Sequence, residues 1–209
     1  MSFAAAERQR LAELLRAKGP DAPTLCEGWT TADLATHLLL REQRPDAAAG
    51  ILVRKLSSHT AAVTQDYESR FSYEEIVDRW AAGLSRWNPL RVADSLVNTC
   101  EHFVHYEDVA RAEGEWEPRD FSAVVNDALF RGVDRFAPIM LKKSTAPVHL
   151  VAPGRTPITV AARRGVAEHG DAGAWVYGDP GELLLWVYGR DAVRVRIEGD
   201  AECIVRSSI

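Results

Sequence analysis

Hydrophobic residues recur at helical spacing through the first two thirds of the chain. Within residues 4–18, Leu11, Leu14 and Leu15 fall on one face while arginine and glutamate occupy the other, and Gly19-Pro20 follows. A period between three and four residues is typical of a helix that buries one side. The same pattern predicts further helices over about 31–41, 72–84, 96–112 and 122–143, with a looser helical segment around Ile51–Leu56.

Two helix starts carry capping residues. Thr30 or Thr31 can accept a hydrogen bond from the free backbone N–H groups of the helix that follows, and Asp33 then lies in its first turn. Negative charge at that position suits the helix dipole. Ser72 and Glu75 form the Ser-x-x-Glu pattern of a capping box. These signals predict where two of the helices begin.

The pattern changes after Ser144 to short apolar segments separated by turns. Asp179-Pro180 is typical of a helix start and predicts a short helix over 182–188. Four segments have the alternation or the β-branched and aromatic content of strands: 147–151, 157–161, 174–177 and 193–197. The sequence therefore predicts an α+β fold with two domains, a helical one over 1–143 and a small α+β one over 144–209.

Composition and charge exclude several classes of protein. With 209 residues and 46% hydrophobic content, the chain is long enough to bury a sizeable core. A net charge of -5 with scattered Lys and Arg argues against nucleic-acid binding. The longest apolar runs, such as Leu183–Val187, are far shorter than a membrane span, and the N-terminus lacks the pattern of a signal peptide. We therefore expect a cytoplasmic protein that contacts neither nucleic acid nor membrane.

Cysteines and sequence motifs give little support to other chemistry. Cys26, Cys100 and Cys203 are odd in number and widely spaced, which is unlike a disulfide framework and fits a reducing compartment. The sequence contains no Gly-x-Ser-x-Gly elbow, phosphate-binding loop or dinucleotide-binding fingerprint. Cys26 has no sequence neighbour that would activate its thiol. For Arg163-Arg164 and Arg190-Asp191 we favour a surface role over anion binding.

The segment 98–108 concentrates the polar chemistry of the chain. If it is helical, Glu101 and His105 are four residues apart and project from one face, whereas His102 lies on another side. A carboxylate and an imidazole so placed can share a divalent metal ion, and Asp108 could accept a hydrogen bond from His105. The alternative is an ordinary charged surface pair. Apolar neighbours favour the metal, because a carboxylate that points inward is costly unless it is paired or binds a cation.

A third ligand would have to come from another helix, and His37 is the candidate. It lies beside Leu34 and Leu38 on a helix face, where a packed core histidine is the alternative interpretation. Metal sites inside helical bundles take their ligands from facing helices. Two histidines and one glutamate supply the three protein ligands of a catalytic zinc and leave a fourth position open. The same donors suit iron, nickel or manganese, so they do not identify the metal.

Three separated motifs resemble one family. Residues 25–37 resemble the pGW-s-x-x-D-L-x-x-H segment of the DinB-like metal-binding helical bundles, which ends here at His37. More specifically, the chain is similar to the mycothiol-dependent maleylpyruvate isomerase group of actinobacteria. The spacing of Glu101–His105, followed by Asp108, matches the family's second motif. Residues 178–190 resemble the helix motif of its C-terminal domain. The resemblance thus spans nearly the whole chain.

This resemblance implies a fold, a metal site and a cosubstrate. The fold would be a DinB-like four-helix bundle followed by a small C-terminal α+β domain. His37, Glu101 and His105 would be the metal ligands, with water completing the site. The metal would be a divalent ion, zinc by the family pattern, while related bundles bind nickel or other divalent ions. Mycothiol would be the cosubstrate.

The residues and the resemblance lead to competing functional hypotheses. In the first, the metal activates a low-molecular-weight thiol for attack on an electrophilic small molecule, as in a mycothiol-dependent isomerase or a thiol S-transferase. In the second, the chain is a non-catalytic metal- or small-molecule-binding module of the sensor or resistance type. In a third, no metal binds. Under the first hypothesis the partners are a small-molecule substrate and a small thiol, and the protein is a monomer or homodimer.

Overall fold

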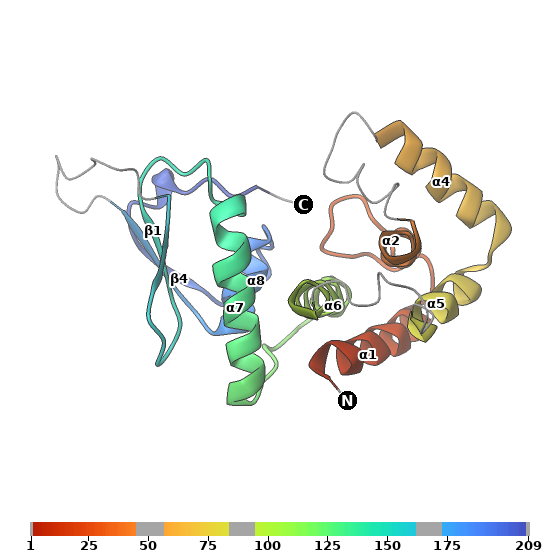
Figure 1. Ribbon diagram of the computed structural model, residues 1–209, viewed down its shortest axis with the longest axis horizontal. Helices are drawn as coiled ribbons and strands as arrows, with labels where there is room; N and C mark the ends of the chain where they lie inside the picture. Colours follow the sequence, from red (N-terminus) through yellow and green to blue (C-terminus); the bar gives the residue numbers. More distant parts are fainter. Residues whose placement is uncertain (1, 45–56, 84–94, 162–172, 208–209) are drawn as a thin grey trace. The chain divides into compact units, whose positions relative to one another are not determined.

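The chain forms two compact units, Met1–Trp116 and Glu117–Ile209 (Figure 1). The computed structural model describes residues 2–44, 57–83, 95–161 and 173–207. The units divide earlier than the predicted boundary at residue 143, because helix α7 (Ala123–Met140) packs against α8 (Pro180–Val187). The predicted domains, a helical one over 1–143 and an α+β one over 144–209, stay a prediction.

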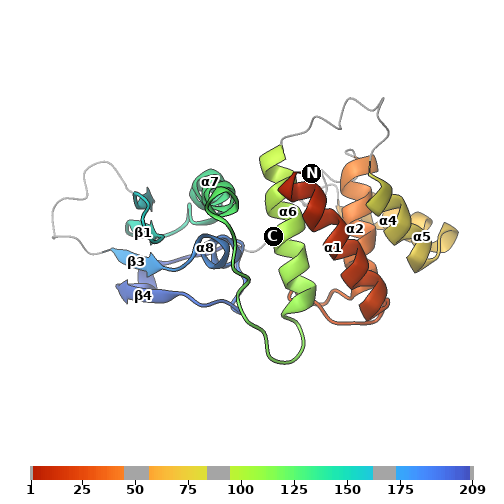
Figure 2. The same ribbon diagram turned by 90° about the horizontal axis from the view of Figure 1, so that it is seen from below.

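The first unit is helical, as the hydrophobic periodicity predicts. Its described helices are α1 (Phe3–Lys18), α2 (Thr31–Gln43), α4 (Ser57–Arg70), α5 (Tyr73–Ala82) and α6 (Ser95–Ala110). Helix α1 packs against α5 and α6, and α2 packs against α4 and α5 (Figure 2). The segment predicted around Ile51–Leu56 and the end of the predicted 72–84 helix lie outside the described residues. Among the described helices of the whole chain, none is both long and apolar enough to cross a membrane.

Both predicted capping signals are confirmed. Thr30 caps α2 and forms a capping box with Asp33, whose Oδ2 accepts from the Thr30 backbone N–H at 2.8 Å. Ser72 caps α5 in the same way, and Glu75 Oε2 accepts from the Ser72 N–H at 2.8 Å. Each box satisfies backbone donors that a helix start would otherwise leave without partners. The start of α2 matters most, because this helix carries His37.

The core of the first unit forms where the apolar faces of the helices meet. Leu11 and Leu15 of α1, Leu34 and Leu38 of α2 and Trp80 of α5 belong to one cluster, and none is more than 2% exposed. A fully buried leucine contributes on the order of 1.5–3 kcal/mol through removal of apolar surface from water. This packing fixes α2 within the bundle and so fixes the helix face that carries the candidate site.

Tyr73→Phe is expected to cost the first unit about 1 kcal/mol, in a pH-dependent way. The Tyr73 hydroxyl donates to the Leu15 carbonyl at 2.7 Å, and burial raises the pKa of Tyr73 to about 12. Because this pKa lies above the usual 10.0, the contribution is present below pH 10 and is lost as pH rises toward 12. Urea unfolding of wild type and variant across this range measures it. A difference in stability that stays constant as the pH rises contradicts the prediction.

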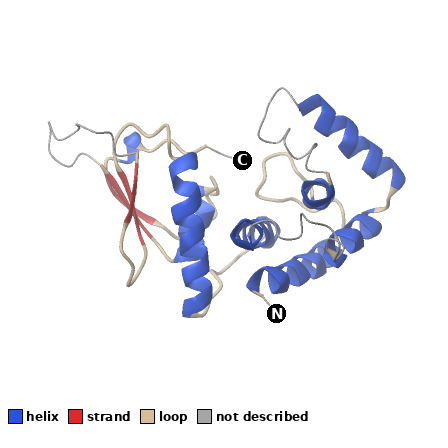
Figure 3. Ribbon diagram, in the orientation of Figure 1, coloured by secondary structure: helices blue, strands red, loops and turns tan. Residues whose placement is uncertain are grey.

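The second unit is a small α+β structure. Its described elements are α7, α8, the strands β1 (Val148–Val151), β2 (Ile158–Val160), β3 (Ala174–Tyr177) and β4 (Arg196–Gly199), and the short 3₁₀ helix η3 (Ala201–Cys203). The strand order is β2-β1-β3-β4, with β1 parallel to β3 and the other two pairs antiparallel. Figure 3 shows α7 and α8 on one face of this sheet. The α+β fold class predicted from the sequence is confirmed.

Two expectations for this unit are wrong. The strand predicted over 193–197 lies at Arg196–Gly199, and all four of its residues are exposed. Arg190, for which a surface role was expected, is buried, and its guanidinium donates to the Tyr188 carbonyl at 2.7 Å. The burial of Arg190 depends on neighbours that are distant in sequence, which a local pattern does not show.

Candidate metal centre

The structure brings the three predicted ligands together. His37 lies on α2, whereas Glu101 and His105 lie one turn apart on α6, and one ligand atom of each lies within 4.8 Å of the others. His105 Nε2 is 3.5 Å from Glu101 Oε2, and the centroids of the two imidazole rings are 5.3 Å apart. The ligand atoms of a tetrahedral zinc, bound at about 2.0–2.1 Å, are about 3.3 Å from one another. The donors therefore fit around such an ion, although metal binding by them stays a prediction.

Asp108 fixes the orientation of His105. The carboxylate of Asp108 is fully buried, and its Oδ2 lies 2.9 Å from His105 Nδ1. An ionised carboxylate only accepts hydrogen bonds, so we assign the hydrogen to Nδ1 and leave Nε2 as the nitrogen that can bind a metal. Histidines that bind metals commonly donate their other N–H in this way. The geometry thus agrees with the supporting role that the sequence suggested for Asp108.

The surroundings favour the protonation states that a metal needs at two of the ligands. Burial, with the charge of His105, lowers the pKa of His37 to about 3, so this imidazole is neutral near pH 7. Burial alone would raise the pKa of Glu101, but the hydrogen bond and charge of His105 and the charge of Arg41 lower it to about 2. For His105, burial lowers the pKa, but the hydrogen bonds that it makes, first to Asp108, raise it well above its usual value. A metal would therefore have to displace a proton from His105.

Arg41 is a member of the site that sequence reasoning missed. Its Nε lies 3.1 Å from Glu101 Oε2, and its two terminal nitrogens donate to Asn98 Oδ1 at 3.2 and 3.0 Å. Its spacing could have revealed it, because Arg41 follows His37 by four residues and shares its helix face. The guanidinium stabilises the charge of Glu101 and holds its carboxylate in place.

The loop between α1 and α2 also contributes to the site. The Trp29 ring lies against His37, with 5.1 Å between ring centroids, and the Cys26 thiol lies 3.2 Å from Asp108 Oδ2. Cys26, His105 and Asp108 form a second group whose potential ligand atoms lie within 4.8 Å of one another. No local pattern could reveal this, because the partner of Cys26 is 82 residues further along the chain.

His102 lies away from the candidate ligands, as expected from its position on another side of the helix. Its Nδ1 is 2.8 Å from the Ala4 carbonyl of α1, and its ring meets that of Trp80 edge to face. Its Nε2 is 3.7 Å from Glu42 Oε1. The side chain is 2% exposed, so His102 is a packed core histidine.

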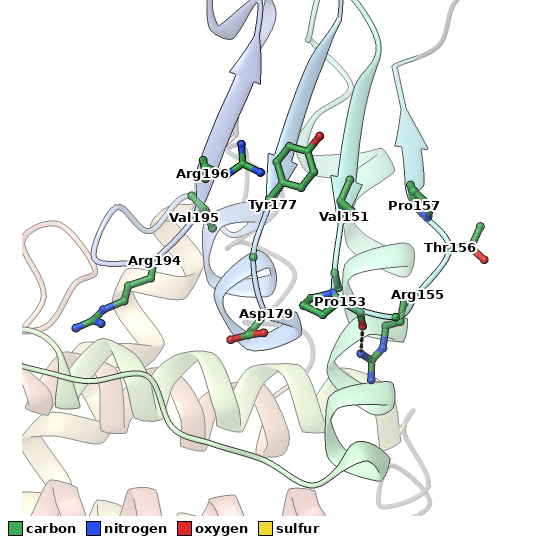
Figure 4. A pocket seen from close by; sticks show the side chains of 13 residues that line it. Val151, Pro153, Arg155, Thr156, Pro157, Tyr177, Asp179, Arg194, Val195 and Arg196 are labelled. Atoms are coloured by element: carbon green, nitrogen blue, oxygen red, sulfur yellow. Dashed lines mark hydrogen bonds between the residues drawn. The ribbon is translucent and has the colours of Figure 1, made fainter.

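A hollow in the second unit offers a different surface (Figure 4). It measures about 990 Å³, is wide open to solvent, and has Arg155, Arg194 and Arg196 among its lining residues. Arg155 pairs with Asp127 at 2.7 Å and Arg194 with Glu117 at 2.7 Å. Arg196 pairs with Glu198. These ion pairs account for the charge of all three guanidinium groups, so the hollow gives no argument for a bound anion.

Comparisons with known proteins agree with the fold and with the family that the sequence resembles. A search of curated proteins finds no match. One solved structure that the chain resembles is described as "Crystal structure of the mycothiol-dependent maleylpyruvate isomerase", with 16% identity, a TM-score of 0.57, and 95% of this chain and 92% of that one covered. At this identity the likeness shows the fold, a helical part followed by an α+β part. The family model "Mycothiol maleylpyruvate isomerase N-terminal domain" matches residues 4–130. The chain therefore belongs to the mycothiol maleylpyruvate isomerase N-terminal domain family.

Proposed function

We propose that this protein binds a divalent metal ion, with zinc as the first choice, and uses it to present a small thiol to an electrophilic small molecule. The observation that carries this function is the cluster of His37, Glu101 and His105, two imidazoles and one carboxylate from two helices. Three protein ligands leave a position for an exchangeable one, which a catalytic zinc requires. The family description and the name of the solved relative support mycothiol as the thiol and isomerisation as the class of reaction.

The residues around the cluster would prepare it for this chemistry. A metal bound there supplies Lewis acidity that favours the thiolate form of a thiol. Asp108 orients His105 through Nδ1, and His105 together with Arg41 keeps Glu101 ionised. In an isomerisation, the thiol sulfur adds to a conjugated double bond, rotation follows about the resulting single bond, and the sulfur leaves, so that the thiol is regenerated. In a transfer, the new carbon–sulfur bond remains and the thiol is consumed.

Thiol chemistry is expected only in the metal-loaded protein. Zinc-loaded and chelator-stripped protein would be incubated with mycothiol, glutathione or cysteine, each with maleylpyruvate or a generic electrophile. Free thiol and double-bond geometry would be followed over time. We expect stripping to lower the rate at least about 100-fold, and added zinc to restore it.

The same assay separates the alternatives. Loss of free thiol indicates a transferase, whereas change of double-bond geometry at constant thiol indicates an isomerase. Metal-dependent binding of a thiol without turnover would favour the non-catalytic binding module. Equal rates with and without metal would refute the proposed function.

A further inference from the structure

We propose that Cys26 is a positioning residue of the metal centre, which acts through Asp108 on His105. This role presupposes the proposed metal site and gives a function to a thiol outside its ligand set. The thiol and His105 Nδ1 lie 3.2 and 2.9 Å from the same atom, Asp108 Oδ2. Since an ionised carboxylate can only accept, both groups donate to that oxygen. The three side chains therefore form a continuous hydrogen-bonded chain that ends at a candidate ligand.

The backbone holds Cys26 in place independently of its thiol. The N–H of Leu25 donates to the Asp108 carbonyl at 2.9 Å, which ties the loop to the end of α6. Within the loop, the Cys26 N–H donates to Thr24 Oγ1 at 3.1 Å, and its carbonyl accepts from the Trp29 N–H at 3.0 Å. Removal of the sulfur should therefore leave the loop anchored. A variant at Cys26 tests the thiol rather than the fold of the loop.

This turn touches both candidate histidines. Cys26 reaches His105 through Asp108, and Trp29, three residues later, packs its ring against His37. Gly28 between them has a φ of 77°, a conformation that favours glycine, and so permits the tight turn. One short segment can thus set the relative orientation of two imidazoles that come from different helices.

The expected contribution of the thiol follows from the burial of its partner. Asp108 is fully buried, and a buried carboxylate must be held by donors that replace water. Without the thiol, one donor to Oδ2 is gone and the carboxylate is less restrained in the orientation that His105 requires. Loss of a group that holds a ligand directly typically lowers metal affinity about 10–100-fold. Cys26 holds Asp108, which in turn holds His105, so we expect a smaller loss of metal affinity, about 3–10-fold.

The test is a cobalt titration of the full chain. Wild type, Cys26→Ala, Cys26→Ser and Cys203→Ala would be titrated with Co²⁺ in competition with a chromophoric chelator, and the d–d absorption bands recorded. We expect Cys26→Ala to bind cobalt about 3–10-fold more weakly, with shifted bands. Serine retains an O–H donor and should restore affinity to within about twofold of wild type. Cys203→Ala, the matched loss of a thiol from the second unit, should match wild type.

A second readout reports on the hydrogen-bonded chain directly. In the ¹⁵N spectrum of histidine-labelled protein, the Nδ1–H signal of His105 should shift or broaden in Cys26→Ala and return in Cys26→Ser. If the alanine variant unfolds, Cys26→Val, which fills the space of the thiol without a donor, takes its place in both measurements. Unchanged affinity, bands and Nδ1–H signal in Cys26→Ala would overturn the role of Cys26 while leaving the metal site intact.

Two further results of the cobalt titration would have different consequences. A charge-transfer band from a sulfur–cobalt bond in wild type would overturn the positioning role, because Cys26 would then be a ligand in the second group with His105 and Asp108. Failure of wild type to bind any metal would overturn the proposed function and this role together.

Discussion

Glu101→Gln is expected to lower the affinity of the protein for zinc by at least about 100-fold, above the usual range for a group outside the ligand set. Glutamine preserves the shape of the side chain but replaces an ionised oxygen by a neutral amide. The Arg41 guanidinium, now 3.1 Å from Glu101 Oε2, would also face the incoming cation without a compensating charge. Affinity would be measured by competition with a chromophoric chelator.

Matched variants separate a lost ligand from a lost fold. His37→Ala removes the ligand from the other helix and should lower the affinity comparably. Glu74→Gln makes the same chemical change as Glu101→Gln at an exposed position of α5, and should bind zinc as wild type does. Circular dichroism would confirm that all variants are folded. Zinc content unchanged in both His37→Ala and Glu101→Gln would refute the three-ligand site.

Much of the helical fold could be predicted because its signals are local. The spacing of Leu11 and Leu15 places α1, and the capping residues Thr30 and Ser72 define where α2 and α5 begin. Strand β4 was misplaced because the alternation over 193–197 suggested a half-buried strand, whereas β4 begins at Arg196 and all four of its residues are exposed. Alternation reports which side chains share a face, but only tertiary structure determines whether another element covers that face.

In the candidate site, too, local signals predict some residues, whereas others depend on tertiary contacts. Glu101 and His105 share a helix face by spacing alone, and Asp108 follows one turn later, so one half of the site could be predicted from a single helix. His37 could be proposed as a ligand, but its position beside Glu101 and His105 could not be predicted, because contact between α2 and α6 depends on the tertiary structure. The role proposed for Cys26 could not be predicted, since it depends on a hydrogen bond to Asp108, 82 positions further along the chain. Sequence patterns thus revealed the candidate ligands better than the groups that surround them.

Glu42 is the clearest case of a residue whose importance no local pattern reveals. This carboxylate of α2 accepts from both terminal nitrogens of Arg8 in α1, at 3.0 and 2.5 Å, and from Trp80 Nε1 in α5 at 3.2 Å. The Arg8 guanidinium also lies over the Trp80 ring, 5.0 Å from its centroid. The side chains of Arg8 and Glu42 are only 15% and 8% exposed. Three helices therefore meet at one buried ion pair.

Glu42→Ala is accordingly expected to destabilise the first unit by about 3–5 kcal/mol, because it leaves the Arg8 charge and the Trp80 N–H without this acceptor in a largely buried place. Asp78→Ala is the matched control. It breaks the 2.6 Å ion pair between Asp78 and Arg16, which also joins α1 to another helix. Because the side chains of Asp78 and Arg16 are 65% and 42% exposed, its loss should cost no more than about 1 kcal/mol. Urea unfolding followed by circular dichroism measures both.

The pH dependence of the stability lost in Glu42→Ala distinguishes a broken ion pair from a cavity. Burial raises the pKa of Glu42, but the interactions of its carboxylate with His102 and with the Arg8 guanidinium outweigh burial, so the folded-state pKa lies below the usual 4.5. The stabilisation by the carboxylate is then fully present above pH 4.5 and is lost as the pH falls through the lower folded-state pKa. The stability gap between wild type and Glu42→Ala should therefore narrow in acid. A cavity would leave the gap constant, and equal losses in Glu42→Ala and Asp78→Ala would show that burial does not strengthen this pair.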